Sequence, residues 1–252
     1  MLLRRLARHV RAHDWFAVAL DFLIVFVGVF VGLEAQKWDD GWKDSRARIA
    51  YLERIANDLE LSINTNDAFR QEAVRIADLG RDAVRWLETC EIPQGRQDDF
   101  AAALFLASKA DMPILRTSAI EEMRAVGKSD LLPSSLRSAL ADLERDQART
   151  DALADQVTQR IVLKIDLVTE RVRFDIDAET HPAEPVGAHA LAYDLDALCG
   201  DGAFVNAVAA LAEQNYRIAV ANERRVAGQG AVRAKILEEV HGLYGQTSSS
   251  SS

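Results

Sequence analysis

Asp21 is the side chain whose surroundings most suggest chemistry, because it lies just before a run of apolar residues. That run extends from Phe22 to Leu33 without a charged residue, so this carboxyl group would lie in or beside the core of a bilayer. Ionisable groups there are costly, and they serve as proton carriers, as polar contacts between helices or as interfacial groups that reach back to water. All three roles are open for Asp21.

Asp21 shares a helical face with small residues. At about 100° per residue, Ala17, Asp21, Gly28, Gly32 and Ala35 fall within about 60° of one another. The spacing of Gly28 and Gly32 is the G-x-x-x-G pattern that lets a second membrane helix approach closely. We therefore expect this stripe to be a helix-packing face, used in self-association or with other membrane subunits.

The rest of the chain offers little other chemistry. Alternating acids from Asp175 precede His181, but an EF-hand loop beginning there would need Gly in place of Thr180 and Glu in place of Val186. Phosphate-binding glycine loops, zinc spacings, a G-x-S-x-G elbow and kinase signatures are not found in the sequence. We expect no catalytic residues, no cofactor and no metal site, and we do not expect an enzyme.

The apolar run itself predicts a transmembrane helix over residues 14–36. Four arginines precede it and acidic residues follow it, so the positive-inside rule places residues 1–13 in the cytoplasm as a basic tail. Trp15, Trp38 and Trp42 flank the run, where interfacial anchors are expected. The predicted location is a bacterial inner membrane, with the lipid bilayer as one partner and the C-terminal part in the periplasm.

A cleaved signal peptide would also have a basic start and an apolar centre. Cleavage needs small residues in an A-x-A-like pattern, whereas Leu33 and Glu34 stand before Ala35. We therefore expect the helix to be retained as an anchor.

Charge and composition narrow the class of protein further. The formal net charge is −9, and the four arginines of the N-terminal tail make the remainder more acidic than the whole chain. Such a surface repels nucleic acid, so no nucleic-acid partner is expected. Few Pro and Gly, together with many Ala, Leu, Arg and Glu, favour helix.

Apolar residues spaced by threes and fours predict an all-α fold in which the transmembrane helix continues into a bundle of long antiparallel helices. The helical extracytoplasmic domain should cover residues 37–244, followed by a disordered tail at 245–252. Gly80 is the expected site of a kink, and Ser118 with Glu121 has the spacing of a capping box. The expected helices are 43–88, 97–110, 118–126, 135–172 and 202–243.

Several polar residues fall on the inward stripes of these helices. Gln147 and Thr150 interrupt the apolar stripe of the 135–172 helix, where they either fix the register of the bundle or mark a part open to water. Cys90 and Cys199 lie at the edges of predicted loops that can fall at opposite ends of an up-down bundle. Two buried free thiols are therefore expected, with a disulfide as the alternative that an oxidising compartment permits.

One further pattern resembles a known group of proteins. It comprises the early acid Asp21, the glycine pair of Gly28 and Gly32 and the exit residue Trp38, followed by the helical segment containing Tyr51 and Asp58. These features, and the short stretch 118–127 that ends in glycine, are similar to an uncharacterised family of bacterial single-pass membrane proteins. The resemblance implies the topology and a helical outer domain, but it implies no reaction and no functional residues.

The sequence thus favours a non-enzymatic accessory, scaffold or assembly subunit of a membrane complex. One alternative is a proton-coupled motor component, because a short cytoplasmic tail, an acid early in one membrane helix and an outer domain is also the layout of ExbD-like and MotB-like proteins. A second alternative is a ligand-sensing helical bundle that works with a partner.

Overall fold

The computed structural model describes residues 15–107, 109–174 and 191–249. The chain divides into two compact units, one up to Tyr51 and one from Leu52 onward. Helix α2 (Trp15–Thr89) contributes its first part to the first unit and its second part to the other. The described residues are mostly helical, which confirms the predicted all-α fold.

In the first unit, α2 exposes a run of large apolar residues. The large apolar side chains between Phe22 and Val31 are between 49% and 72% exposed, and these positions lie on every face of the helix. Among the described residues, no helix combines the length and the apolar character that are needed to cross a membrane.

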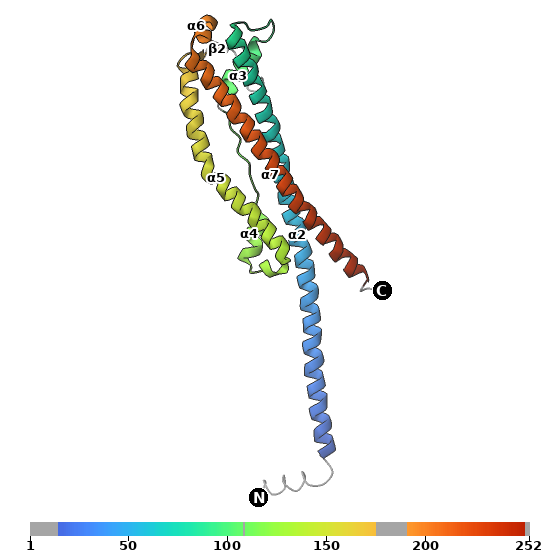
Figure 1. The fold of residues 1–252 in the computed structure, drawn as a ribbon. Helices are drawn as coiled ribbons and strands as arrows, with labels where there is room; N and C mark the ends of the chain where they lie inside the picture. Colours follow the sequence, from blue (N-terminus) through green and yellow to red (C-terminus); the bar gives the residue numbers. More distant parts are fainter. Residues whose placement is uncertain (1–14, 108, 175–190, 250–252) are drawn as a thin grey trace. The chain divides into compact units, whose positions relative to one another are not determined.

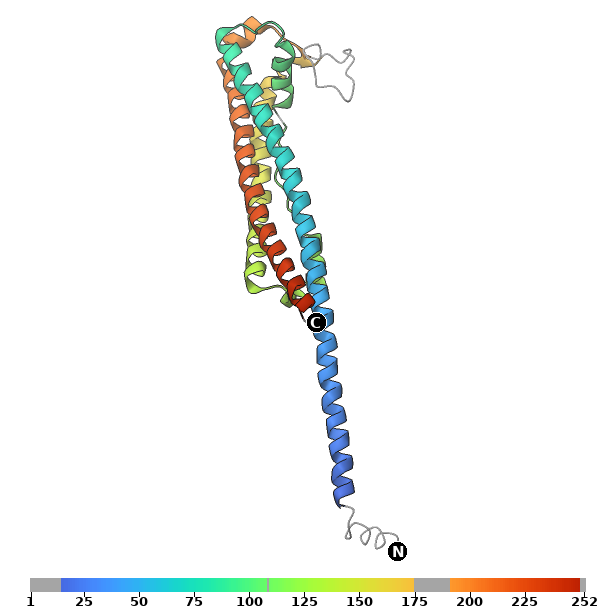
Figure 2. The same ribbon diagram turned by 90° about the vertical axis from the view of Figure 1, so that its right-hand side faces the viewer.

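The second unit is an up-down bundle with three long helical members (Figures 1 and 2). They are the second part of α2, α5 (Ser134–Thr169) and α7 (Gly202–Ser249). The fourth member is composite. It consists of α3 (Gln97–Leu106), a non-helical connecting segment (residues 109–117) and α4 (Ser118–Ala125).

Small elements close the two ends of this bundle. A 3-10 turn, η1 (Ser129–Leu131), leads from α4 towards α5. At the other end, β1 (Arg173–Phe174) pairs antiparallel with β2 (Leu191–Ala192), and α6 (Leu195–Gly200) precedes α7. The helical spacing in the sequence predicted none of these short elements. Residues 175–190, which include the acidic stretch before His181, lie outside the described part of the chain.

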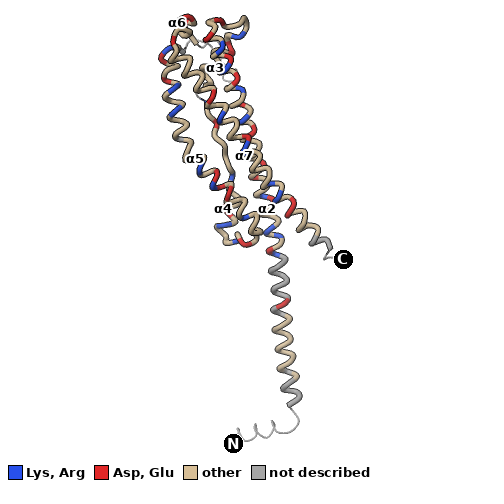
Figure 3. The backbone as a smooth tube through the Cα atoms, viewed as in Figure 1, with Lys and Arg blue, Asp and Glu red and all other residues tan. Residues whose placement is uncertain are grey.

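Aromatic residues fill the core at the end of the bundle where α2 finishes. Trp86 of α2 lies 6.3 Å from Phe100 of α3, measured between ring centroids, and Phe204 of α7 is fully buried in the same cluster. Acidic and basic residues are interspersed along the helices, as Figure 3 shows. Many of these residues form ion pairs with a residue three positions away in the same helix, such as Arg75 with Glu72. Such pairs are exposed to water, so they add little to the stability of the fold.

Helix α2 continues through Gly80, where a kink was expected, and that kink stays a prediction. A Cβ added at Gly80 would lie 2.7 Å from Cβ of Ala212, so Gly80 allows α7 to approach. One prediction about α4 is wrong. The capping box at Ser118 does not form. Instead, Asp58 Oδ2 of α2 accepts hydrogen bonds from the Ser118 hydroxyl and from the backbone N–H of Ala119.

A glycine forms the C-terminal cap of α4. Gly127 adopts φ +69°, and its N–H donates to the carbonyl of Arg124, while Lys128 donates to Met123. These are the two hydrogen bonds of a Schellman motif. By contrast, α7 ends later than expected: it continues to Ser249, so the first residues of the predicted disordered tail at 245–252 are helical, and residues 250–252 lie outside the described part.

The expectation of two free thiols is also wrong. Cys90 and Cys199 form a disulfide, with their Cα atoms 5.5 Å apart. The two cysteines can meet because of the composite member. It runs antiparallel to α2 and so leads the chain back along the bundle before α5 begins. The connection after α2 and the connection before α7 therefore lie at the same end, and the two cysteines meet.

Candidate functional site

The predicted helix-packing face is only partly described. Gly28 lies within α2, and a Cβ added there would meet nothing within 4 Å. The side chains at the other predicted positions lie outside the described residues, although their backbone is helical. These positions are the packing residues Ala17, Asp21, Gly32 and Ala35 and the interfacial anchors Trp15, Trp38 and Trp42.

In the second unit, buried amides hold the connecting segment. Asn66 of α2 is fully buried, and its amide group makes two reciprocal 2.8 Å hydrogen bonds with Ile114, one to the carbonyl and one from the N–H. Gln229 of α7, also fully buried, donates to the same carbonyl at 2.9 Å and accepts from Asn66 at 3.0 Å. The backbone of Ile114 is thus bound from two helices.

Other side chains continue this pattern along the composite member. Asn215 donates to the carbonyl of Ala107 at 3.2 Å, and Gln147 donates to that of Pro113 at 3.1 Å. Non-helical backbone in a core needs such partners, because an unpaired buried peptide group costs about 1–3 kcal/mol. The remaining contacts are of the same kind, from Asn222 to the carbonyl of Asp111 and from the N–H of Arg116 to the hydroxyl of Ser62.

Arg225 of α7 connects this network to α5. Only 7% of the residue is exposed, and its guanidinium donates to Gln147 Oε1 at 3.1 Å and to the hydroxyl of Thr150. It also pairs with Asp146 Oδ2 at 3.2 Å, so the buried charge is compensated. Of the two roles open for Gln147 and Thr150, the structure supports the first, because both bind a partner on the opposing helix.

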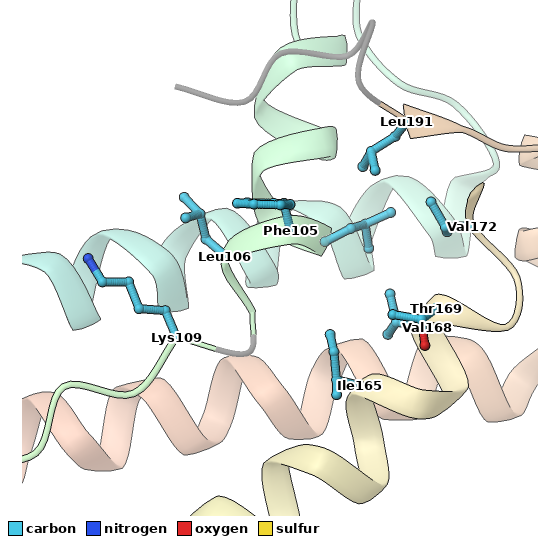
Figure 4. A pocket seen from close by; sticks show the side chains of 9 residues that line it. Phe105, Leu106, Lys109, Ile165, Val168, Thr169, Val172 and Leu191 are labelled. Atoms are coloured by element: carbon cyan, nitrogen blue, oxygen red, sulfur yellow. The ribbon is translucent and has the colours of Figure 1, made fainter. Parts of the chain in front are cut away.

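A pocket of about 380 Å³ lies between α3, α5 and β2 (Figure 4). Its walls are almost entirely apolar, and they come from parts of the chain that are distant in sequence. Phe105 is 40% exposed, whereas Leu104, Val168 and Val172 belong to the buried core. The residues that line the pocket are Leu104, Phe105, Leu106, Lys109, Ile165, Val168, Thr169, Val172 and Leu191.

The charges beside the pocket are paired with one another. Lys109 Nζ lies 3.3 Å from Glu72 Oε1 and 3.5 Å from Asp111 Oδ2. Arg75 also binds Glu72, and this hydrogen bond is the main reason that the pKa of Glu72 falls to about 2, with Lys109 adding to the effect. At neutral pH the group therefore contains two cations and two carboxylates.

Thr169 supplies the hydroxyl group among the lining residues. Its Oγ1 donates to the carbonyl of Asp166 at 3.2 Å, so the lone pairs of the hydroxyl stay available to accept a hydrogen bond. The sequence analysis expected an apolar stripe on the 135–172 helix, on which Ile165, Val168 and Val172 lie, but it did not identify a pocket. No local sequence pattern could identify the pocket, because the wall opposite α5 is formed by α3 and β2, which are distant in the sequence.

Within the described residues, no group of three His, Cys, Asp or Glu side chains could hold a metal ion. Comparison of the chain with models of known families, with curated proteins and with solved structures finds no match. The resemblance to a family of single-pass membrane proteins therefore stays a prediction.

Proposed function

We propose that this protein is a non-enzymatic, single-pass membrane protein that acts as an accessory, scaffold or assembly subunit of a membrane complex. Its N-terminal helix anchors it in a bacterial inner membrane, with residues 1–13 in the cytoplasm and the helical bundle in the periplasm. Its partners are the bilayer and either other membrane subunits or further copies of the chain.

The exposed apolar side chains of α2 carry this proposal. From Phe22 to Val31, large apolar side chains at least 49% exposed lie on all sides of the helix. A helix that is apolar all round is stable only inside a larger apolar body or a membrane. A bilayer supplies such surroundings without a further protein.

The disulfide supports the compartment by an independent route. Cys90 and Cys199 are bonded to each other. Disulfides persist in oxidising compartments such as the periplasm and are rare in the cytosol. Two features are therefore consistent with a periplasmic second unit: the disulfide, and the arginines that precede the apolar run while acidic residues follow it.

The proposed assembly face is tested by substitution within α2. Replacing Gly28 and Gly32 together with Leu adds bulk to this face and keeps the helix apolar, so insertion should persist while close association fails. The matched control replaces Phe26 and Phe30 with Leu, because these residues have the same spacing on the opposite face. Native gels after mild detergent extraction should show a smaller species for the Gly pair alone; equal migration of both variants and wild type would refute the packing face.

Asp21→Asn separates this proposal from the motor alternative. The substitution keeps the shape of the side chain and removes its ionisable group, so packing should survive and proton handling should not. We expect Asp21→Asn to complement a deletion strain as well as wild type does. Normal assembly with failed complementation would favour the motor-like function instead.

A further inference from the structure

We propose that the pocket between α3, α5 and β2 binds a small neutral molecule with an apolar body and one hydrogen-bond donor, such as a medium-chain alcohol. This inference concerns the second unit alone and does not depend on membrane anchoring. It gives the bundle a ligand-binding role in addition to that of a subunit.

The size and walls of the pocket fit a small apolar molecule. Its volume of about 380 Å³ falls at the lower end of the roughly 300–1,000 Å³ that is typical of small-molecule sites. The walls combine Leu and Phe side chains of α3 with Ile and Val side chains of α5. Such walls release water on binding, which is the dominant favourable contribution for an apolar ligand.

The charges at the pocket disfavour an ionic ligand. Lys109 is the lining cation, and Glu72 and Asp111 already neutralise it. A carboxylate ligand would have to displace one of these acids, and a cationic ligand would meet Lys109. Since neither sign of charge is left in excess, binding should favour a neutral molecule.

Thr169 defines where the polar end of such a ligand would lie. Its hydroxyl donates to the carbonyl of Asp166 and can still accept. A ligand hydroxyl can donate to Thr169 Oγ1 while the hydrocarbon chain contacts Ile165 and Val168. This arrangement satisfies the polar groups on both sides without moving the Lys109 ion pairs.

The test uses the full-length protein in lipid nanodiscs and a decanol analogue that carries a photoreactive diazirine in its chain. After photolysis, peptide mass spectrometry should find the label on the segments 104–109 and 165–172. Excess decanol should compete, whereas decanoate and decyltrimethylammonium should compete at least about tenfold more weakly. Equal competition by either ion would overturn the assignment of a neutral ligand.

Variants distinguish this site from labelling in the lipid phase. Ile165→Trp fills the pocket and should reduce labelling of these segments about tenfold. Leu163→Trp, at a 68% exposed position on the same helix, should leave it unchanged. Labelling confined to residues 22–33, or unaffected by Ile165→Trp, would refute the proposed site.

Two further substitutions guard against a folding defect and test the hydroxyl. Phe105→Trp adds bulk from an exposed position of α3, so it should also reduce labelling even if Ile165→Trp unfolds the bundle. Thr169→Val should weaken competition by decanol about fivefold, as expected for the loss of one hydrogen bond, whereas Thr169→Ser should restore it. A Thr169→Val variant that binds decanol as wild type does would contradict the proposed role of the hydroxyl.

Discussion

At the scale of single residues, the contact between Gly80 and Ala212 decides how closely α2 and α7 pack. A Cβ at position 80 would lie 2.7 Å from Cβ of Ala212, which is inside the van der Waals distance. Gly230 in α7 is the opposite case, because an added Cβ there meets nothing within 4 Å. The same substitution should therefore have opposite effects at the two positions.

We predict that Gly80→Ala lowers the free energy of unfolding by about 1–3 kcal/mol through overpacking. Gly230→Ala should raise it by roughly 0.5–1 kcal/mol, because Ala has the higher helix propensity. Urea unfolding followed by circular dichroism measures both. Adding Ala212→Gly to Gly80→Ala should recover part of the loss; a Gly80→Ala variant as stable as Gly230→Ala would show that this contact is loose.

The sequence pattern placed three of the buried polar residues inward, but it missed Ser62, Arg225 and Gln229 and did not show what any of them binds. Asn66, Asn215 and Asn222 lie on apolar stripes with helical spacing, and all three are at most 1% exposed. Their partners are backbone groups of the composite member, which has no sequence period that could reveal its path. For the same reason, Asp58 was not recognised as the residue that caps α4.

At the scale of elements, the composite member takes the place of a fourth long helix. Among the described residues, the connecting segment has no strand neighbour to satisfy its peptide groups, and side chains from α2, α5 and α7 do so. Asn66 is central to this arrangement, because it binds both the N–H and the carbonyl of Ile114.

We predict that Asn66→Ala lowers the free energy of unfolding by about 2–4 kcal/mol, because the buried N–H of Ile114 and the amide oxygen of Gln229 lose their partner. The control is Thr65→Ala: Thr65 is half-buried, and its hydroxyl donates to the carbonyl of Leu61 in its own helix, at a solvent-exposed position. Urea unfolding gives the stability, and hydrogen exchange at Ile114 should accelerate in the first variant alone. Unchanged exchange at Ile114 would mean that the Asn66 amide does not protect this peptide group.

Helical spacing predicted the long elements well and the irregular ones poorly. The helix predicted at 135–172 is α5 (Ser134–Thr169), and the one predicted from 202 begins at Gly202. A helical spacing can be recognised only over several turns, so it could not predict the two-residue strands or the six-residue helix α6. It could not predict the pocket either, because its walls combine α3, α5 and β2.

At the scale of the whole molecule, connectivity explains the disulfide, and the disulfide bears on the compartment. An up-down bundle of four members places its first and third connections at one end, where Cys90 and Cys199 bond. Counting the long helices alone could not reveal this, because the composite member, which follows α2 in the chain, is not a long helix. Anchoring through residues 14–36 and a periplasmic bundle together form the central claim of the proposed function.

The most direct test of this claim is a pair of reporter fusions after Ser252, expressed in a Gram-negative host. Alkaline phosphatase is active only in the periplasm and β-galactosidase only in the cytoplasm. Our account predicts an active phosphatase fusion and an inactive β-galactosidase fusion, and deletion of residues 1–36 should reverse both. An inactive phosphatase fusion together with an active β-galactosidase fusion on the intact chain would contradict it.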